Sequence, residues 1–196
     1  MSKSLGISHN DTSFIVQGYQ LSGVTSVDGS YSITQSPINV LGFGYTVPTL
    51  SSPFVGNFSI ARNMVSKDPL LYYTGESHLN GAVKYNNKSF GFTSGYLTNY
   101  SIACAVGEIP SISNTLSVFG EIGGDVKAWN EETSITDSET HPSIQIPQQG
   151  SIHVTCDNST SNRIAGFSFT VNSSRSPIYA VNQHTPIQVD LDYPLE

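Results

Sequence analysis

The chain has 196 residues, of which 37% are hydrophobic and only 12% are charged, and its formal net charge is −7. A chain of this length can bury a core, but its charged share is about half that usual in soluble proteins. The negative balance argues against binding to phosphate backbones or anionic lipid, and no apolar run approaches the roughly 20 residues that span a bilayer.

The N-terminal residues 1–13 are expected to form a flexible arm that lacks the apolar stretch of a secretion signal, so synthesis in a cytoplasm is expected. From Phe14 onward, short runs of alternating apolar and polar residues recur between Gly, Pro and Asn. This alternation is typical of antiparallel sheets, and abundant Ser and Thr suit strands and turns. The sequence therefore predicts an all-β fold, an antiparallel sandwich or barrel, as one domain over residues 14–196.

A Ser-Pro-Ile motif occurs twice, in SPINVLGFG from Ser36 and in SPIYAVNQH from Ser176. Each copy follows an alternating strand and precedes a strand led by proline, Pro53 or Pro186. The two copies therefore predict two corresponding hairpins of a sheet protein.

The first copy is longer than the second, and its additional residues form an expected extended loop over residues 42–52. This loop carries four large apolar side chains, those of Phe43, Tyr45, Val47 and Leu50. Such a loop is costly unless it is covered, either by its own domain or by a neighbouring molecule. The four side chains are the candidate assembly residues.

One short α-helix is predicted over Asp68–Thr74. Asp68 can cap it, Pro69 suits the first turn and Gly75 can end it. The run Leu-Leu-Tyr-Tyr is apolar nearly all round, so the helix is expected to flank the sheet.

The region from Phe90 to Gly124 predicts further strands, with Tyr100, Ile102 and Cys104 on one face. An acidic excursion is expected over residues 121–139, which contain six acids and the single tryptophan, Trp129. Cys104 and Cys156 are expected to be buried thiols, and whether they pair is left open.

No pattern of catalytic or metal-ligating residues stands out. The five histidines are scattered, and GFTSG at 91–95 lacks the serine of a nucleophile elbow. Asp137, Glu139 and His141 could hold a divalent cation, although a solvated acidic loop is far commoner. Asp190 and Asp192 are expected on the solvent face of a strand. No enzymatic activity and no cofactor are therefore expected.

Four segments together resemble a known family: GVTSVDGSYSITQSPINVLGFG, GNFSIARNMVSKDPLLYYTG, SGYLTNYSIACAVGEIPSISNTLSVFGEIGG and RSPIYAVNQHTPIQVDLDYPL. The chain resembles the tail tube (major tail) proteins of long-tailed bacteriophages in these sequence segments and in the order of its elements, over residues 18–125 and 163–196. The resemblance implies a β-sandwich with one flanking helix, assembled into hexameric rings that stack into a tube.

The resemblance also implies partners and a location. The chain would associate with itself and with other tail proteins (terminator, baseplate or tip, and sheath in a contractile tail), within the virion tail. Loop 42–52 and the N-terminal arm would lock successive rings. DNA would pass without sticking along an acidic channel wall, for which the candidate residues are Asp28, Glu131, Glu132, Asp137 and Glu139.

Three alternatives remain open. The chain could be a baseplate or other tail structural protein. It could also be a carbohydrate-binding sandwich, a receptor-binding tip or adhesin, with Trp129 as the stacking residue. The third is a β-sandwich hydrolase, which predicts a cleft with two carboxylates that the sequence does not display.

Overall fold

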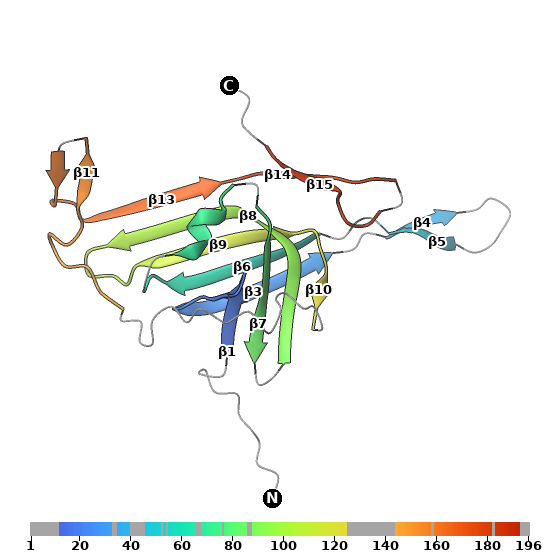
Figure 1. Cartoon of the computed structure of the whole chain (residues 1–196), viewed down its shortest axis with the longest axis horizontal. Helices are drawn as coiled ribbons and strands as arrows, with labels where there is room; N and C mark the ends of the chain where they lie inside the picture. The colour runs from blue at the N-terminus through green and yellow to red at the C-terminus, as the bar shows by residue number, and fades with distance from the viewer. Residues whose placement is uncertain are drawn as a thin grey trace, which may run out of the picture.

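The computed structural model describes residues 12–32, 35–39, 46–51, 53, 55–65, 68–75, 77–85, 88–124, 144–157, 159–181 and 183–192 (Figure 1). The predicted all-β, antiparallel fold is confirmed. In chain order the elements are β1 (Thr12–Val16), β2 (Tyr19–Gln20), β3 (Val24–Ser32), β4 (Gln35–Asn39), β5 (Thr46–Ser51), β6 (Val55–Asn63), η2 (Pro69–Tyr73), β7 (Leu79–Tyr85), β8 (Lys88–Ala105), β9 (Ser111–Val118), β10 (Ile122–Gly123), β11 (Val154–Cys156), β12 (Ser159–Ser161), β13 (Gly166–Asn172), β14 (Arg175–Ile178) and β15 (Gln188–Leu191).

The long strand β8 joins two layers of one nine-stranded sheet. Its first half pairs with β7 and β10, and its second half pairs with β9 and β13. Figure 1 shows β8 curving between these halves, so that β1 and β7 cross the direction of β3 and β6. We call β2–β1–β7–β8–β10 layer A and β13–β8–β9–β6–β3 layer B.

The bend in β8 is located at Ser94 and Gly95. Ser94 has a φ of 52°, and its amide N–H donates to Oδ1 of Asn80 at 3.0 Å. A Cβ atom on Gly95 would lie 2.5 Å from the ring of Phe92, so only glycine allows this approach. The pairing of β8 with β9 then shifts register between Leu97 and Asn99. A local irregularity of this kind re-aims a strand.

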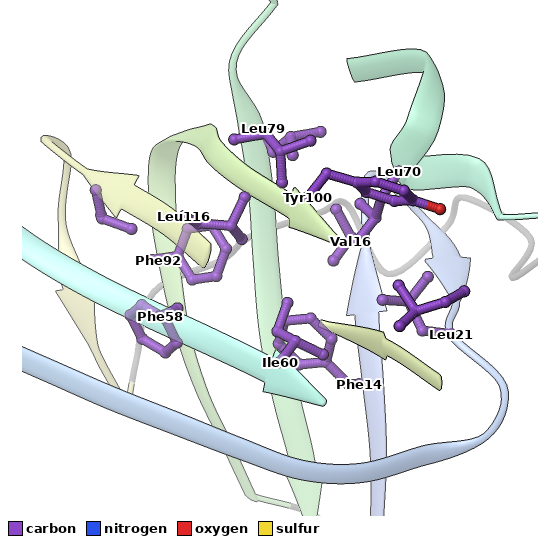
Figure 2. Packing of buried hydrophobic residues seen from close by; sticks show 13 residues of the cluster. Phe14, Val16, Leu21, Phe58, Ile60, Leu70, Leu79, Phe92, Tyr100 and Leu116 are labelled. Atoms are coloured by element: carbon purple, nitrogen blue, oxygen red, sulfur yellow. The ribbon is translucent and has the colours of Figure 1, made fainter. Parts of the chain in front are cut away.

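The core lies between the two layers. Along β6, exposed and buried residues alternate, as expected for a strand with one face on a core. Figure 2 shows side chains from both layers pointing toward one another, and the rings of Phe58 and Phe92 have centroids 4.6 Å apart. The buried cluster consists of Phe14, Val16, Leu21, Phe58, Ile60, Leu70, Leu79, Phe92, Leu97, Tyr100, Ile112, Leu116 and Val118. Burial of each large side chain contributes about 1.5–3 kcal/mol.

The predicted flanking helix is present as η2, but it is a 3₁₀-helix rather than an α-helix. The carboxylate of Asp68 accepts a hydrogen bond from the Leu70 N–H at 2.8 Å, and Pro69 occupies the first turn, as predicted. The helix has five residues and buries only Leu70, while Tyr72 is 82% exposed. So short a run gains little from continuing as an α-helix.

Both copies of the Ser-Pro-Ile motif lie in hairpins, as predicted. Ser176–Ile178 in β14 pairs with β15, the strand that follows Pro186. Ser36–Ile38 in β4 pairs with β5, however, and not with the strand after Pro53. That later strand, β6, belongs to layer B. The additional residues of the first copy thus include its own partner strand, because six of the eleven residues of the expected loop 42–52 form β5.

Two predicted boundaries fall differently in the structure. β1 begins at Thr12, which pairs with Tyr85, so the last residues of the predicted arm form part of layer A. Ile122 and Gly123 of the predicted acidic excursion form β10. Residues 1–11 and 125–143 lie outside the described residues.

Cys104 and Cys156 are both free. Cys104 is half-buried, whereas Cys156 is exposed, so the prediction of burial is wrong for Cys156. Among the described strands, β11 pairs with β12 alone, and a two-stranded hairpin has few neighbours that could cover a side chain such as that of Cys156.

Candidate assembly surface

Layer B has a long, free backbone edge on each side. Within the described part of the chain, β13 pairs only with β8, and β3 pairs only with β6. Figure 1 shows these two strands at opposite margins of the layer. The outermost strands of layer A, β2 and β10, have two residues each. Long edges expose unpaired N–H and C=O groups, so within the described part of the nine-stranded sheet the edges of layer B are the longest templates for another strand.

The edge strand β13 carries none of the usual protection against pairing. Its sequence, GFSFTVN, has no charge and no proline, and it pairs with β8 without a bulge. Phe167 and Phe169 are 41% and 51% exposed, although they point to the side of the sheet on which the core lies. An uncovered apolar edge strand of this kind is a site for association.

The opposite edge, β3, is also accessible. Tyr31 is 64% exposed, and Val27 is only partly buried against the core. The strand contains one charged residue, Asp28, and one register irregularity near its start, between Val24 and Ser26. The rest of the strand, seven residues, pairs regularly with β6.

The side of layer B that faces away from the core is covered by hydroxyl and amide groups, and we call it the polar face. On its central strands the register places Ser111, Ser113, Thr115 and Ser117 of β9 opposite Asn63, Ala61, Ser59 and Asn57 of β6. The flanking strands continue the same pattern with Asn99, Ser101 and Ala103 on β8, Ser168, Thr170 and Asn172 on β13, and Ser26, Asp28 and Ser30 on β3.

Hydrogen bonds between neighbouring strands order the polar face. Asn99 Nδ2 donates to Asn172 Oδ1 at 2.7 Å, and the hydroxyls of Ser101 and Thr170 are hydrogen-bonded at 3.1 Å. Ser117 Oγ donates to Oδ1 of Asn57 at 3.2 Å. Cross-strand hydrogen bonds of this kind stabilise the pairing of the strands.

Asp28 carries the only charge among the described residues of the polar face. It was one of the predicted channel-wall acids, and it lies exposed opposite Ser59. The other four candidates, Glu131, Glu132, Asp137 and Glu139, lie outside the described residues. The described face is therefore neutral except at one position.

The predicted assembly residues are only partly described. Phe43 and Tyr45 lie outside the described residues. Val47 and Leu50 lie in β5, opposite Ile38 and Ser36. Sequence reasoning did not identify the two free edges. Phe167, Phe169 and Val171 alternate with polar residues as expected for one face of a strand, but nothing in this local pattern shows that the strand lies at an edge.

A buried polar cluster holds η2 against the inner side of layer B. Arg62 of β6 forms an ion pair with Asp68, and both side chains are 5% exposed. Burial raises the pKa of the Tyr100 phenol, and the charge of Asp68 together with a hydrogen bond to it raises that pKa further. Tyr100 is therefore held neutral and bonded to the carboxylate that caps the helix.

Other functional sites have little support in the described part of the chain. It contains no group of three or more His, Cys, Asp or Glu residues arranged to hold a metal ion, and no helix long and apolar enough to cross a membrane. The sequence candidates Asp137, Glu139 and His141, and the stacking candidate Trp129, lie outside it. Asp192, predicted to face solvent, is exposed and accepts a hydrogen bond from Ser176 Oγ at 2.8 Å.

Comparison with known proteins found no matching family model and no matching curated protein. Solved structures do contain similar chains. One is from the virion of a native gene transfer agent particle, with a TM-score of 0.48, 10% identity, and coverage of 61% of this chain and 98% of that chain. Another is from the tail of an empty gene transfer agent particle with C6 symmetry, with a TM-score of 0.43, 9% identity, and coverage of 61% and 98%.

A third similar chain is from the six-fold symmetrised baseplate of the anti-feeding prophage, with a TM-score of 0.38, 8% identity, and coverage of 58% of this chain and 91% of that chain. At TM-scores below 0.5, these similarities assign no role to any residue of this chain.

Proposed function

We propose that this protein is a non-enzymatic structural subunit of a virion tail, which assembles with copies of itself into rings that stack into a tube. The observation that carries the proposal is the pair of long, free edges on opposite sides of layer B in the described part of the chain. The resemblance of four sequence segments to tail tube proteins supports the same reading. Copies of the chain, together with other tail proteins, are its proposed partners.

Edge pairing supplies the proposed mechanism of assembly. The free edge of β3 in one copy meets the free edge of β13 in the next, and the sheet continues from subunit to subunit. Because the two edges are different surfaces, this contact is heterologous, and repeated heterologous contacts close into a ring when the rotation allows. The exposed Phe167 and Phe169 then become covered by the neighbouring subunit.

The polar face supports the proposed role of the ring interior. With the polar face turned to the axis, the described part of the channel wall carries hydroxyl and amide groups and one carboxylate per subunit, that of Asp28. Because the described residues of the polar face include no lysine or arginine, they give phosphate groups no cation to bind, and the repeated Asp28 charge repels them. DNA therefore passes along such a wall without sticking.

The test compares the wild-type chain with Phe169→Lys in β13, using negative-stain electron microscopy and size-exclusion chromatography. Lysine on an exposed edge strand opposes pairing, so the variant should remain folded and monomeric while the wild type forms rings or tubes. Val181→Lys is the matched control, because Val181 is 91% exposed and lies outside every strand. A wild-type chain that stays monomeric at high concentration would refute the proposal.

A further inference from the structure

The direction of the two edge strands follows from the pairing within layer B. Four neighbouring pairs connect the edges, namely β13 with β8, β8 with β9, β9 with β6, and β6 with β3. Every one of these pairs is antiparallel. Four reversals restore the original direction, so β13 and β3 of one subunit run the same way. Figure 1 shows both arrows pointing toward the same side of the layer.

The symmetry of a ring preserves this direction from one subunit to the next. Subunits that turn the same face toward a common axis are related by rotation about that axis, which does not invert strands that run along it. We infer that the seam between subunits is a parallel pair, in which β3 of one copy lies beside β13 of the next with the same polarity. This inference rests on the proposed function.

Side chains on both sides of the seam are compatible with this arrangement. On the core side of the sheet, Val27 and Tyr31 of one copy come beside Phe167 and Phe169 of the next, so four partly exposed apolar groups share one surface. Aromatic and β-branched neighbours on adjacent strands stabilise pairing. On the polar face, the seam joins serine positions of β3 to Ser168 and Thr170, so this face continues from one subunit to the next.

The main alternative is a two-fold contact between two copies of β13. A two-fold axis perpendicular to the sheet would pair these strands in the antiparallel direction and would yield a closed dimer instead of a ring. Each alternative predicts a different order of neighbouring residues along the seam, so disulfide trapping can distinguish them.

Cysteine pairs provide the test, because adjacent strands lie about 4.8 Å apart, within the Cα separation that a disulfide bridges. Each double variant carries one cysteine on each strand, chosen from polar-face positions: Ser26, Ser30 and Ser32 on β3, and Ser168, Thr170 and Asn172 on β13. Assembled material is oxidised, and mass spectrometry of the linked peptides identifies each bond, which separates it from bonds of the native Cys104 and Cys156. Single variants such as Thr170→Cys are the controls.

In a parallel seam, the trapped partner of Ser30→Cys has a higher residue number on β13 than the partner of Ser26→Cys. The reverse order would show an antiparallel seam and overturn the inference. Efficient linking of Thr170→Cys to itself would show the two-fold contact, and rings without any β3–β13 bond would place the seam elsewhere. Both results also overturn it. Failure of the wild type to form rings refutes the proposed function instead, so the two failures are distinguishable.

Discussion

The guanidinium group of Arg175 lies over the ring of Tyr96, with its central carbon 5.5 Å from the ring centroid. The same group donates hydrogen bonds to the carbonyl oxygens of Gly75 and Thr74, just after η2, and to that of Leu97 in β8. Cations are favourable at the carbonyl end of a helix. One side chain of β14 therefore connects the C-terminal hairpin to the helix and to β8 just beyond its bend.

Replacing Arg175 with alanine should destabilise the fold by about 2 kcal/mol, because hydrogen bonds from a charged donor are lost and partly buried carbonyls are left unpaired. Urea denaturation followed by circular dichroism measures the loss. Arg163→Ala is the matched control, since Arg163 is exposed and should give a change within about 0.5 kcal/mol. Equal effects of both substitutions would contradict a specific role for Arg175.

Replacing Gly95 with alanine should also destabilise the fold, because the new methyl group would meet the ring of Phe92 at the bend of β8. Overpacking of a filled core typically costs about 1–3 kcal/mol. At Gly75, by contrast, an added Cβ has no atom within 4 Å, so Gly75→Ala serves as the control. If Gly95→Ala and Gly75→Ala show the same melting temperature, the bend of β8 does not depend on Gly95.

Stability should fall at high pH through Tyr100. The ordinary phenol pKa of 10.0 describes the unfolded chain, and the pKa is raised in the folded protein, first by burial and then by Asp68. The unfolded state therefore releases its proton first, so this contribution is complete below pH 10 and is lost as the pH rises through the folded-state pKa.

Urea denaturation between pH 8 and 11 measures this decline, and Tyr100→Phe should make it shallower. Tyr31→Phe, at an exposed position, should leave it unchanged. Some decline should persist in Tyr100→Phe because burial also raises the pKa of Tyr96 and of Tyr179. An unchanged pH dependence in Tyr100→Phe would show that Tyr100 does not contribute.

If the polar face lines the channel of the proposed tube, Asp28→Lys should make that channel retain DNA. The substitution replaces the only charged group among the described residues of the polar face with a cation, which the proposed ring would repeat in every subunit. Retention of short duplex DNA by the assembled tubes should appear in the variant and weaken as salt increases. Glu108→Lys has the same charge change at an exposed turn and should retain no DNA if the polar face lines the channel.

Removing residues 1–11 should separate ring formation from stacking. The deletion leaves β1 and both edges of layer B intact, and the N-terminal arm is proposed to lock successive rings. Electron microscopy should therefore show single rings without tubes. Shortening residues 42–45, which precede β5 in the sequence and belong to the predicted locking loop 42–52, should have the same effect. Tubes of normal length from both variants would remove these segments from the locking role.

Much of the fold could be predicted from local patterns. Period-two alternation identified the shared face of Tyr100, Ile102 and Cys104 in β8, because side chains of a strand point alternately to its two sides. The pair Asp68-Pro69 predicted the start of η2, and the repeated Ser-Pro-Ile motif predicted two hairpins. The predictions of an α-helix over Asp68–Thr74 and of a buried Cys156 were wrong. Both properties depend on how much of a short element is covered by neighbouring structure.

What the sequence determined by itself was the chemistry of each strand, including the serine, threonine and asparagine positions that form the polar face. Only the tertiary structure decided which strands are neighbours, and therefore which edges are free. The pairing of β13 with β8 joins Phe169 to Ile102 across a large part of the chain, and no local pattern encodes such a contact. The alternation of apolar and polar residues specifies the two faces of a strand. Whether an edge of the strand is free depends on which other strand forms backbone hydrogen bonds with it, and distant parts of the chain decide that.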